Sequence, residues 1–182
     1  MSESRFERAI SRWRVRISLV CVLLAVVLAK PKLWSLFVGL GLTLLGLFIR
    51  TWACGHLEKE KKLITTGPYR YTRNPLYLGN LLIGIGVVVS ALSLWVLAVF
   101  LVLFLVFYPV VIHSEKQKME HLFPTEYATY REKVPLFLPN LKPSLPRQTT
   151  PFSRSLYKKN KEYRALIGTA IFWIAMAGRL IF

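Results

Sequence analysis

Residues 67–77 read GPYRYTRNPLY, a polar and aromatic stretch with two prolines that separates two long apolar runs. Apolar residues dominate 33–49 before it and 76–112 after it, and the second run carries no charged residue. A helix needs roughly 20 apolar residues to cross the hydrocarbon core of a bilayer, so the second run is long enough for about two crossings. The stretch therefore predicts a polar segment at a membrane boundary.

The composition of the whole chain is typical of a helical membrane protein. Its 182 residues suffice for one domain, and 54% of them are apolar. A soluble helical protein is a poor alternative, because so much contiguous apolar surface would have nothing to cover it. We expect an all-α integral membrane bundle that forms a single domain over residues 1–182. About five transmembrane helices are predicted, near 15–29, 33–53, 75–91, 94–112 and 165–182.

The first apolar run is interpreted as a retained span rather than a signal peptide. The charged region before it contains Glu3 and Glu7, and a second apolar run follows almost at once. Glycines inside the apolar runs are expected to let helices pack closely. These glycines are Gly39, Gly41, Gly46, Gly79, Gly84 and Gly86.

Basic residues concentrate in three segments of this chain, whose net charge is +16. Five arginines lie in 1–16, five Lys or Arg in 54–75, and eleven in 113–164. With five spans these segments fall on one side, which the positive-inside bias makes cytoplasmic. We expect a cytoplasmic N-terminus and a cytoplasmic cap made of 54–74 and 113–164. The basic run 157–164 is interpreted as a solvated, lipid-facing anchor for the last span, and no motif supports a nucleic-acid partner.

Disulfide or metal chemistry is not indicated. Two cysteines, Cys21 and Cys54, give no disulfide framework and no metal spacing. The three histidines, His56, His113 and His121, also lack the spacing of metal ligands.

The segment around Pro75 predicts the start of a helix. Proline favours the first helical position and asparagine favours the cap before it, so Asn74 and Pro75 should open the third span. A helix N-terminus carries partial positive charge and free N–H groups, which suit a carboxylate or phosphate. The positively charged guanidinium group of Arg73 could bind the same anion. The alternative is a plain capped helix with interfacial Tyr and Arg anchors.

A second polar segment follows the fourth predicted span. Met119, Phe123, Tyr127, Tyr130 and Val134 are spaced by four, four, three and four residues, which places them on one helical face. The proline at position 124 must bend or restart that helix.

Glu115 lies at the end of the same span, where a carboxylate is costly unless it is paired. Its partner could be Arg73, or a bound cation such as a sulfonium. The alternative is a surface contact with Lys116 or Lys118, which would contribute little energy.

The two polar segments together resemble the signature of the isoprenylcysteine carboxyl methyltransferase and phospholipid methyltransferase family. That family has Gly-x-Tyr, then Arg-His-Pro-x-Tyr or Arg-Asn-Pro-x-Tyr, and after a helical hairpin Glu-Glu-x-x-Leu-x-x-x-Phe-Gly-x-x-Tyr-x-x-Tyr, followed by a valine and a proline. The resemblance covers 54–139, about half the chain. The matching residues are Gly67, Tyr69, Arg73, Asn74, Pro75, Tyr77, Glu115, Phe123, Tyr127, Tyr130, Val134 and Pro139.

The resemblance implies methyl transfer from S-adenosylmethionine to a lipophilic acceptor, such as an isoprenylcysteine carboxylate or a phospholipid amine. It implies catalytic roles for Arg73, Asn74 and Glu115, and an acceptor that arrives from the bilayer. The implied cofactor-binding residues are Leu63, Gly67, Pro68, Tyr69, Arg73, Asn74, Pro75, Tyr77 and Glu115.

This chain departs from the family pattern at four positions. Asn74 stands where isoprenylcysteine enzymes usually have histidine, Lys116 replaces the second glutamate, Met119 replaces the leucine, and Pro124 replaces the glycine. Two alternatives to a methyltransferase stay open. One is a membrane NADPH-dependent reductase of the sterol-reductase type, which carries a similar Arg-His-Pro-x-Tyr segment. The other is a non-catalytic helical membrane protein.

Overall fold

The computed structural model describes residues 20–58, 61–142, 145 and 150–181. Residues 20–28 are helical, and no strand occurs among the described residues, so the predicted all-α class is confirmed for that part of the chain. The first predicted span, 15–29, lies partly outside it. The other elements are α2 (Leu33–Cys54), the 3-10 helix η1 (Gly67–Arg70), α3 (Pro75–Ala91), α4 (Leu94–Leu122), α5 (Pro124–Lys133), α6 (Arg154–Lys159) and α7 (Tyr163–Ile181).

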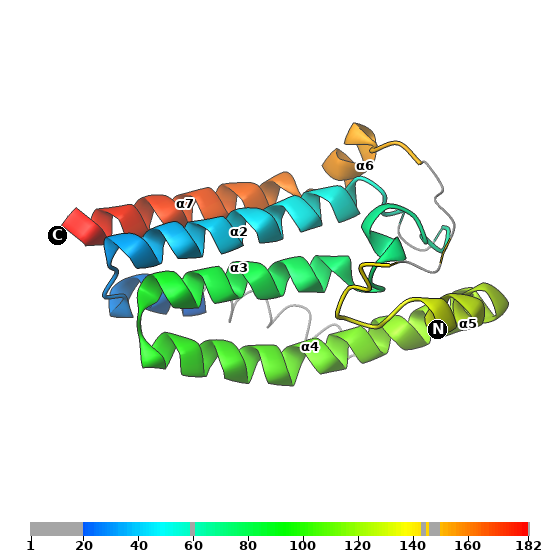
Figure 1. The fold of residues 1–182 in the computed structure, drawn as a ribbon, viewed down its shortest axis with the longest axis horizontal. Coiled ribbons are helices and arrows are strands. Elements are labelled where there is room, and N and C mark those ends of the chain that lie inside the picture. The colour runs from blue at the N-terminus through cyan, green and yellow to red at the C-terminus, as the bar shows by residue number, and fades with distance from the viewer. Residues whose placement is uncertain (1–19, 59–60, 143–144, 146–149, 182) are drawn as a thin grey trace.

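Four long helices lie side by side in the order α7, α2, α3, α4, and the chain direction alternates from each to the next (Figure 1). The described parts of 55–74 and 123–153 gather at one end of this bundle, together with α5 and α6 (Figure 1). The two segments expected to form a cap are therefore adjacent in space. We call this end the motif end.

In the described part of the chain, two helices, α2 and α4, are long and apolar enough to cross a membrane, and α3 is a shorter apolar helix. Within α4, Val96 is the one buried residue, so the apolar part of the helix, 94–112, is otherwise half-buried or exposed. Such a surface is suited to contact with lipid. The helix continues to Leu122, past the predicted end at residue 112, and α7 begins at Tyr163 rather than 165. The full set of five spans stays a prediction.

Glycines bring α2 and α3 into backbone contact. A Cβ atom on Gly39 would lie 2.5 Å from the carbonyl oxygen of Gly86, and one on Gly46 would lie 2.6 Å from that of Gly79. Both contacts are reciprocal, since Cβ atoms on Gly86 and Gly79 would meet the carbonyls of Gly39 and Gly46. Small residues permit this close approach in helical membrane proteins. A packing role for Gly41 is wrong, because nothing lies within 4 Å of its Cβ position.

The turn between α3 and α4 falls where the sequence predicted it, after Ser90 and Ala91. Leu92 adopts a left-handed conformation with φ of 46°, and its N–H donates to the carbonyl of Val88 at 3.2 Å. Ser93 then occupies the N-cap position of α4. This tight reversal places α4 antiparallel to α3, which returns the chain to the motif end.

Candidate functional site

The stretch 67–77 is held against the segment 134–140. The backbone N–H of Arg73 donates to the carbonyl of Pro135 at 2.9 Å, and the N–H of Asn140 donates to the carbonyl of Tyr71 at 2.8 Å. The hydroxyl of Thr72 donates to the carbonyl of Phe137 at 2.8 Å. The two segments linked by the sequence resemblance are thus in direct contact.

Asn74 and Pro75 begin α3 as predicted, with Asn74 at the N-cap position and Pro75 as the first helical residue. The Asn74 side chain makes no capping hydrogen bond to the first turn of α3. Its amide nitrogen instead donates to the carbonyl of Leu136 at 2.8 Å. Asn74 therefore joins the start of α3 to the 134–140 segment.

Gly67 and Pro68 shape the backbone just before this helix start. Gly67 has a φ of 59°, a conformation that side chains disfavour, and a Cβ atom there would lie 2.9 Å from the ring of His56. Pro68 is buried at the start of η1. These two predicted cofactor-binding residues thus have a structural role in the turn.

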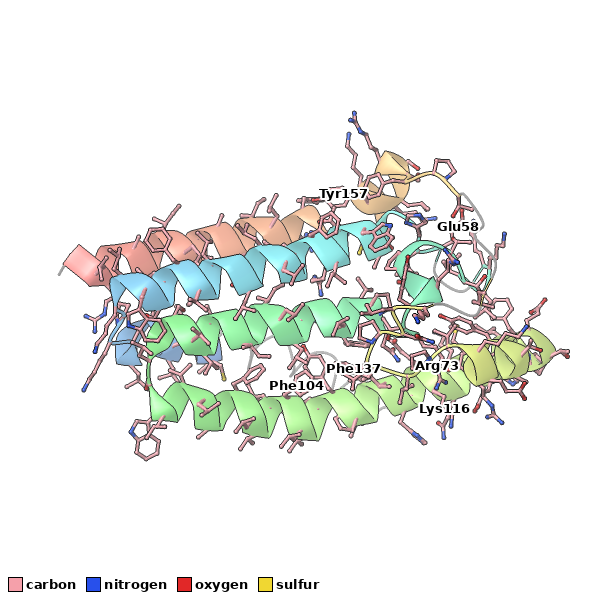
Figure 2. The ribbon with its side chains drawn as sticks, in the orientation of Figure 1. Glu58, Arg73, Phe104, Lys116, Phe137 and Tyr157 are labelled. Carbon is pink, nitrogen blue, oxygen red and sulfur yellow. The ribbon has the colours of Figure 1, made fainter. Side chains whose placement is uncertain are left out.

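Glu115 lies at the motif end and is bound by a tyrosine. The hydroxyl of Tyr77, on the first turn of α3, donates to Glu115 Oε1 at 2.5 Å. The Tyr77 ring is buried and packs edge-on against Tyr108 of α4, with centroids 5.5 Å apart. Lys116 lies on the side of α4 away from α3 (Figure 2), and its Nζ is 3.8 Å from Glu120 Oε1. Sequence reasoning did not anticipate the phenol partner of Glu115.

Arg73 reaches α5. Its Nη1 donates to the hydroxyl of Tyr127 at 3.3 Å, and its guanidinium carbon lies 6.0 Å from the centre of the Tyr127 ring. The Nε atom of Arg73 is buried and has no hydrogen-bond partner among the described residues. The pairing of Arg73 with Glu115 that the sequence suggested is replaced by these contacts with Tyr127.

The predicted helical face of the second polar segment is confirmed. Tyr127, Tyr130 and Val134 form a buried cluster, against which Leu63, Met119, Phe123 and Leu145 pack. The break between α4 and α5 falls just before Pro124, as its cyclic side chain requires. Tyr130 donates a hydrogen bond of 2.7 Å to the carbonyl of Tyr69, which ties α5 to the 67–77 stretch.

Tyr69 is 8% exposed, and its hydroxyl has no hydrogen-bond partner among the described residues. Burial raises the pKa of Tyr69 well above its usual value, with smaller contributions from Cys54, Tyr130, Glu115 and Tyr77. Burial also raises the pKa of Tyr130, and the neighbouring Arg73 opposes that shift. Both phenols are therefore neutral hydrogen-bond donors at physiological pH.

Three buried polar atoms without partners lie in the 67–77 stretch. In the described part of the chain, Tyr69 Oη, Arg70 Nε and Arg73 Nε are buried and unpaired. A buried polar group without a hydrogen bond costs roughly 1–3 kcal/mol. Their concentration in the stretch whose Tyr77 binds Glu115 indicates a place where a ligand supplies the missing acceptors.

Sequence reasoning missed a second polar cluster at the motif end. Arg50 of α2 binds Glu162 through two hydrogen bonds, Nε to Oε1 at 2.6 Å and Nη2 to Oε2 at 2.8 Å. Its Nη1 donates to Asn80 of α3, and the Cys54 thiol lies 3.2 Å from Glu162 Oε2. The signals were an arginine in an apolar helix and the one acidic residue in the run 154–164. The solvated interpretation of the run 157–164 is wrong for Glu162, which is 5% exposed.

Comparison with known proteins gives two similar curated relatives. One is the "Cobalt-zinc-cadmium resistance protein CzcN" of Cupriavidus metallidurans, 36% identical over 115 residues, which are 62% of this chain and 51% of the relative. The other is the "Nickel-cobalt-cadmium resistance protein NccN" of Alcaligenes xylosoxydans xylosoxydans, 31% identical over 138 residues, 71% of this chain and 63% of the relative. The chain thus spans less than two thirds of either relative. No solved structure matches it.

The match to a protein family covers most of the site but ends before Tyr127 and the segment 134–140. The sequence model described as "Phospholipid methyltransferase" matches residues 34–126, from α2 to the start of α5. That range includes the 67–77 stretch, the α3–α4 hairpin and Glu115. The chain therefore belongs to the phospholipid methyltransferase family.

Proposed function

We propose that the motif end binds S-adenosylmethionine and transfers its methyl group to a lipophilic acceptor. The observation that carries the proposal is the group of buried, unpaired donors in 67–77, the stretch whose Tyr77 donates a hydrogen bond to Glu115. Membership of a methyltransferase family supports the reaction class. The acceptor, the cofactor and a cytoplasmic position for this end are all part of the proposal.

The chemistry of the residues fits this cofactor. A carboxylate at Glu115 suits a positively charged sulfonium group, and the guanidinium of Arg73 suits the carboxylate of an amino acid. The Tyr69 hydroxyl offers a neutral donor to a polar edge of the ligand. Leu63 and the rings of Tyr127 and Tyr130 form an apolar wall nearby. When bound, S-adenosylmethionine supplies an electrophilic methyl group.

Residues at the motif end orient the reacting groups and exclude water from them. Tyr77 fixes the orientation of the Glu115 carboxylate through its 2.5 Å hydrogen bond. Asn74 and the first turn of α3 place the partial positive charge of a helix start beside Arg73. A methyl transfer requires an in-line approach of the nucleophile, so alignment and exclusion of water supply most of the acceleration.

A row of aromatic rings supports a lipophilic acceptor. Phe104 stacks on Tyr108 with centroids 4.3 Å apart, and Phe104 also meets Phe137 at 6.1 Å. Figure 2 shows Phe104 between α3 and α4, and Phe137 close to the start of α3. The row continues through Tyr108 to Tyr77, which binds Glu115. We place the acceptor's hydrocarbon along these rings, with its nucleophile toward Glu115.

Calorimetric titration of the detergent-purified protein tests the proposal. S-adenosylmethionine and S-adenosylhomocysteine should bind, and NADPH should not. Binding of NADPH alone would favour the reductase alternative, and binding of neither would favour a non-catalytic protein.

Variants at two glutamates of α4 sharpen this test. Glu115→Gln should abolish cofactor binding because it removes the negative charge that faces the cation. Glu120→Gln is the matched control, since Glu120 pairs on the surface with Lys116 and Arg131 and should leave binding unchanged. Arg73→Ala should weaken binding by about 1.5–3 kcal/mol, as for a hydrogen bond to a charged group.

The names of the relatives supply a physiological readout. Both are named for resistance to divalent metals. We propose that the methyl transfer of this chain also contributes to such resistance. Growth of the source cells on cobalt, zinc, cadmium or nickel should then fall with Glu115→Gln and not with Glu120→Gln.

A further inference from the structure

An apolar groove lies at the motif end beside α2. It is lined by Phe48, Thr51 and Trp52 of α2 and by Phe152, and its volume is about 220 Å³. Almost all of its lining surface is apolar. Phe48 is 63% exposed on a helix that is long and apolar enough to cross a membrane, so the groove opens onto a surface suited to lipid.

Backbone contacts hold Phe152 in place on α2. The N–H of Ser153 donates to the carbonyl of Gly55 at 3.0 Å. A Cβ atom at Gly55 would lie 2.1 Å from the Phe152 ring, so the ring sits where only glycine leaves room. Asn160 donates to the carbonyls of Cys54 and Leu57, each at 3.0 Å, and so fixes the end of α6 to the end of α2.

Basic residues follow Phe152, a groove-lining residue, directly along the chain. The one acidic residue among 154–164 is Glu162, which is buried and bound by Arg50. Its charge is therefore compensated within the protein and does not neutralise the surface cations. The exposed cations of this segment are Arg154, Lys158, Lys159, Lys161 and Arg164.

We propose that this groove and the cations of 154–164 together bind one anionic lipid, with a segment of acyl chain in the groove and the phosphate headgroup on the cations. The groove is smaller than the roughly 300–1,000 Å³ of pockets that enclose a whole small molecule, so the rest of the chain lies along the exposed face of α2. Charge complementarity selects an anionic headgroup.

The lipid site is separate from the proposed cofactor site and does not depend on methyl transfer. It meets the 67–77 stretch through one ring pair, Trp52 and Tyr71, whose centroids are 6.0 Å apart. A bound lipid should therefore also stabilise the packing of this stretch against α2.

Lipid retention by the purified protein, measured by native mass spectrometry, tests the proposal. Phosphatidylglycerol should be retained in preference to phosphatidylcholine of the same chains. The triple variant Lys158→Gln, Lys159→Gln, Lys161→Gln should lower its retention by about tenfold or more, because each lost charge weakens the attraction to an anionic lipid. Equal retention of the two lipids by the unmodified protein would overturn the proposal.

A matched triple variant controls for net charge. Lys61→Gln, Lys62→Gln, Lys142→Gln removes the same charge from other exposed positions at the motif end and should leave retention nearly unchanged. An equal loss in both triple variants would show diffuse attraction and contradict a specific site.

The groove itself is tested by Thr51→Trp, which fills it. This variant should release phosphatidylglycerol while keeping the melting temperature measured without lipid. Undiminished retention in this variant would contradict the acyl-chain half of the proposal. Soluble glycerol phosphate should not compete with the lipid, and effective competition would assign the site to free phosphate instead.

Discussion

The two buried polar clusters at the motif end differ in how completely their hydrogen-bonding groups are used. Around Arg50, all three guanidinium nitrogens donate and both oxygens of Glu162 accept. In the 67–77 stretch, Tyr69 Oη and Arg73 Nε are buried without partners in the described part of the chain. A completed network fixes the helices that contribute to it. A cluster with unused donors is expected to bind a ligand.

Removing one partner of the completed cluster should have the largest effect. Glu162→Gln leaves the Arg50 charge partly buried and unneutralised, which typically destabilises a protein by about 3–5 kcal/mol. Thermal unfolding in detergent should show the loss. The exposed pair of Glu120 with Arg131 is the control, since Glu120→Gln should cost less than about 1 kcal/mol. Similar losses in the two variants would mean that Arg50 and Glu162 do not hold α2, α3 and α7 together.

The close approach of α2 and α3 supports the Arg50 cluster, and disrupting it should have the second-largest effect on stability. A Cβ atom at Gly79 would lie 2.5 Å from Arg50 Cγ and 2.7 Å from the Gly46 carbonyl. Gly79→Ala should therefore destabilise by about 1–3 kcal/mol, as overpacking does. Gly41→Ala meets nothing within 4 Å and should be neutral or stabilising by up to about 1 kcal/mol. Chemical denaturation of the two variants compares them, and equal effects would contradict the helix contact.

Tyr69→Phe should change stability and ligand affinity in different directions, which distinguishes the cluster with unused donors from the completed one. Removing an unpaired buried hydroxyl should leave stability unchanged or raise it by about 1 kcal/mol. The affinity for S-adenosylmethionine should fall by about 0.5–1.5 kcal/mol if the ligand accepts from this hydroxyl. Tyr130→Phe is the control, because it removes an existing bond to the Tyr69 carbonyl and should lower stability. A stability loss in Tyr69→Phe without an affinity change would count against the ligand site.

The smallest effect is a dependence of stability on alkaline pH. The folded state raises the pKa of Tyr69 and Tyr130 above the unfolded value of about 10. As the pH rises, the two phenols therefore lose their protons first in the unfolded state. Their contribution to the free energy of unfolding is complete below about pH 10 and declines above it. The melting temperature should fall between about pH 10 and 11, and less steeply in Tyr130→Phe. An unchanged slope would exclude Tyr130 as a cause.

The sequence by itself determined the helical class, the hairpin turn after Ser90, the start of α3 at Pro75 and the restart at Pro124. Each follows from local chemistry, since apolar run length, glycine and proline act within a few residues. The resemblance also linked 67–77 with 113–139, and the backbone hydrogen bond from Arg73 to Pro135 holds those segments together. The outer limits of α4 and α7 were less well predicted, because helix ends depend on contacts beyond the helix.

Only the tertiary structure decided the partners of the charged groups. Arg50 and Glu162 are 112 residues apart, and no local pattern relates them. Glu115 is bound by Tyr77 rather than Arg73, because the antiparallel α3 and α4 bring that phenol to it. Tyr69 lacks a partner because the surrounding contacts bury its hydroxyl without an acceptor. Burial and long-range pairing are properties of the packed chain, and they separate the completed cluster from the one proposed to bind a ligand.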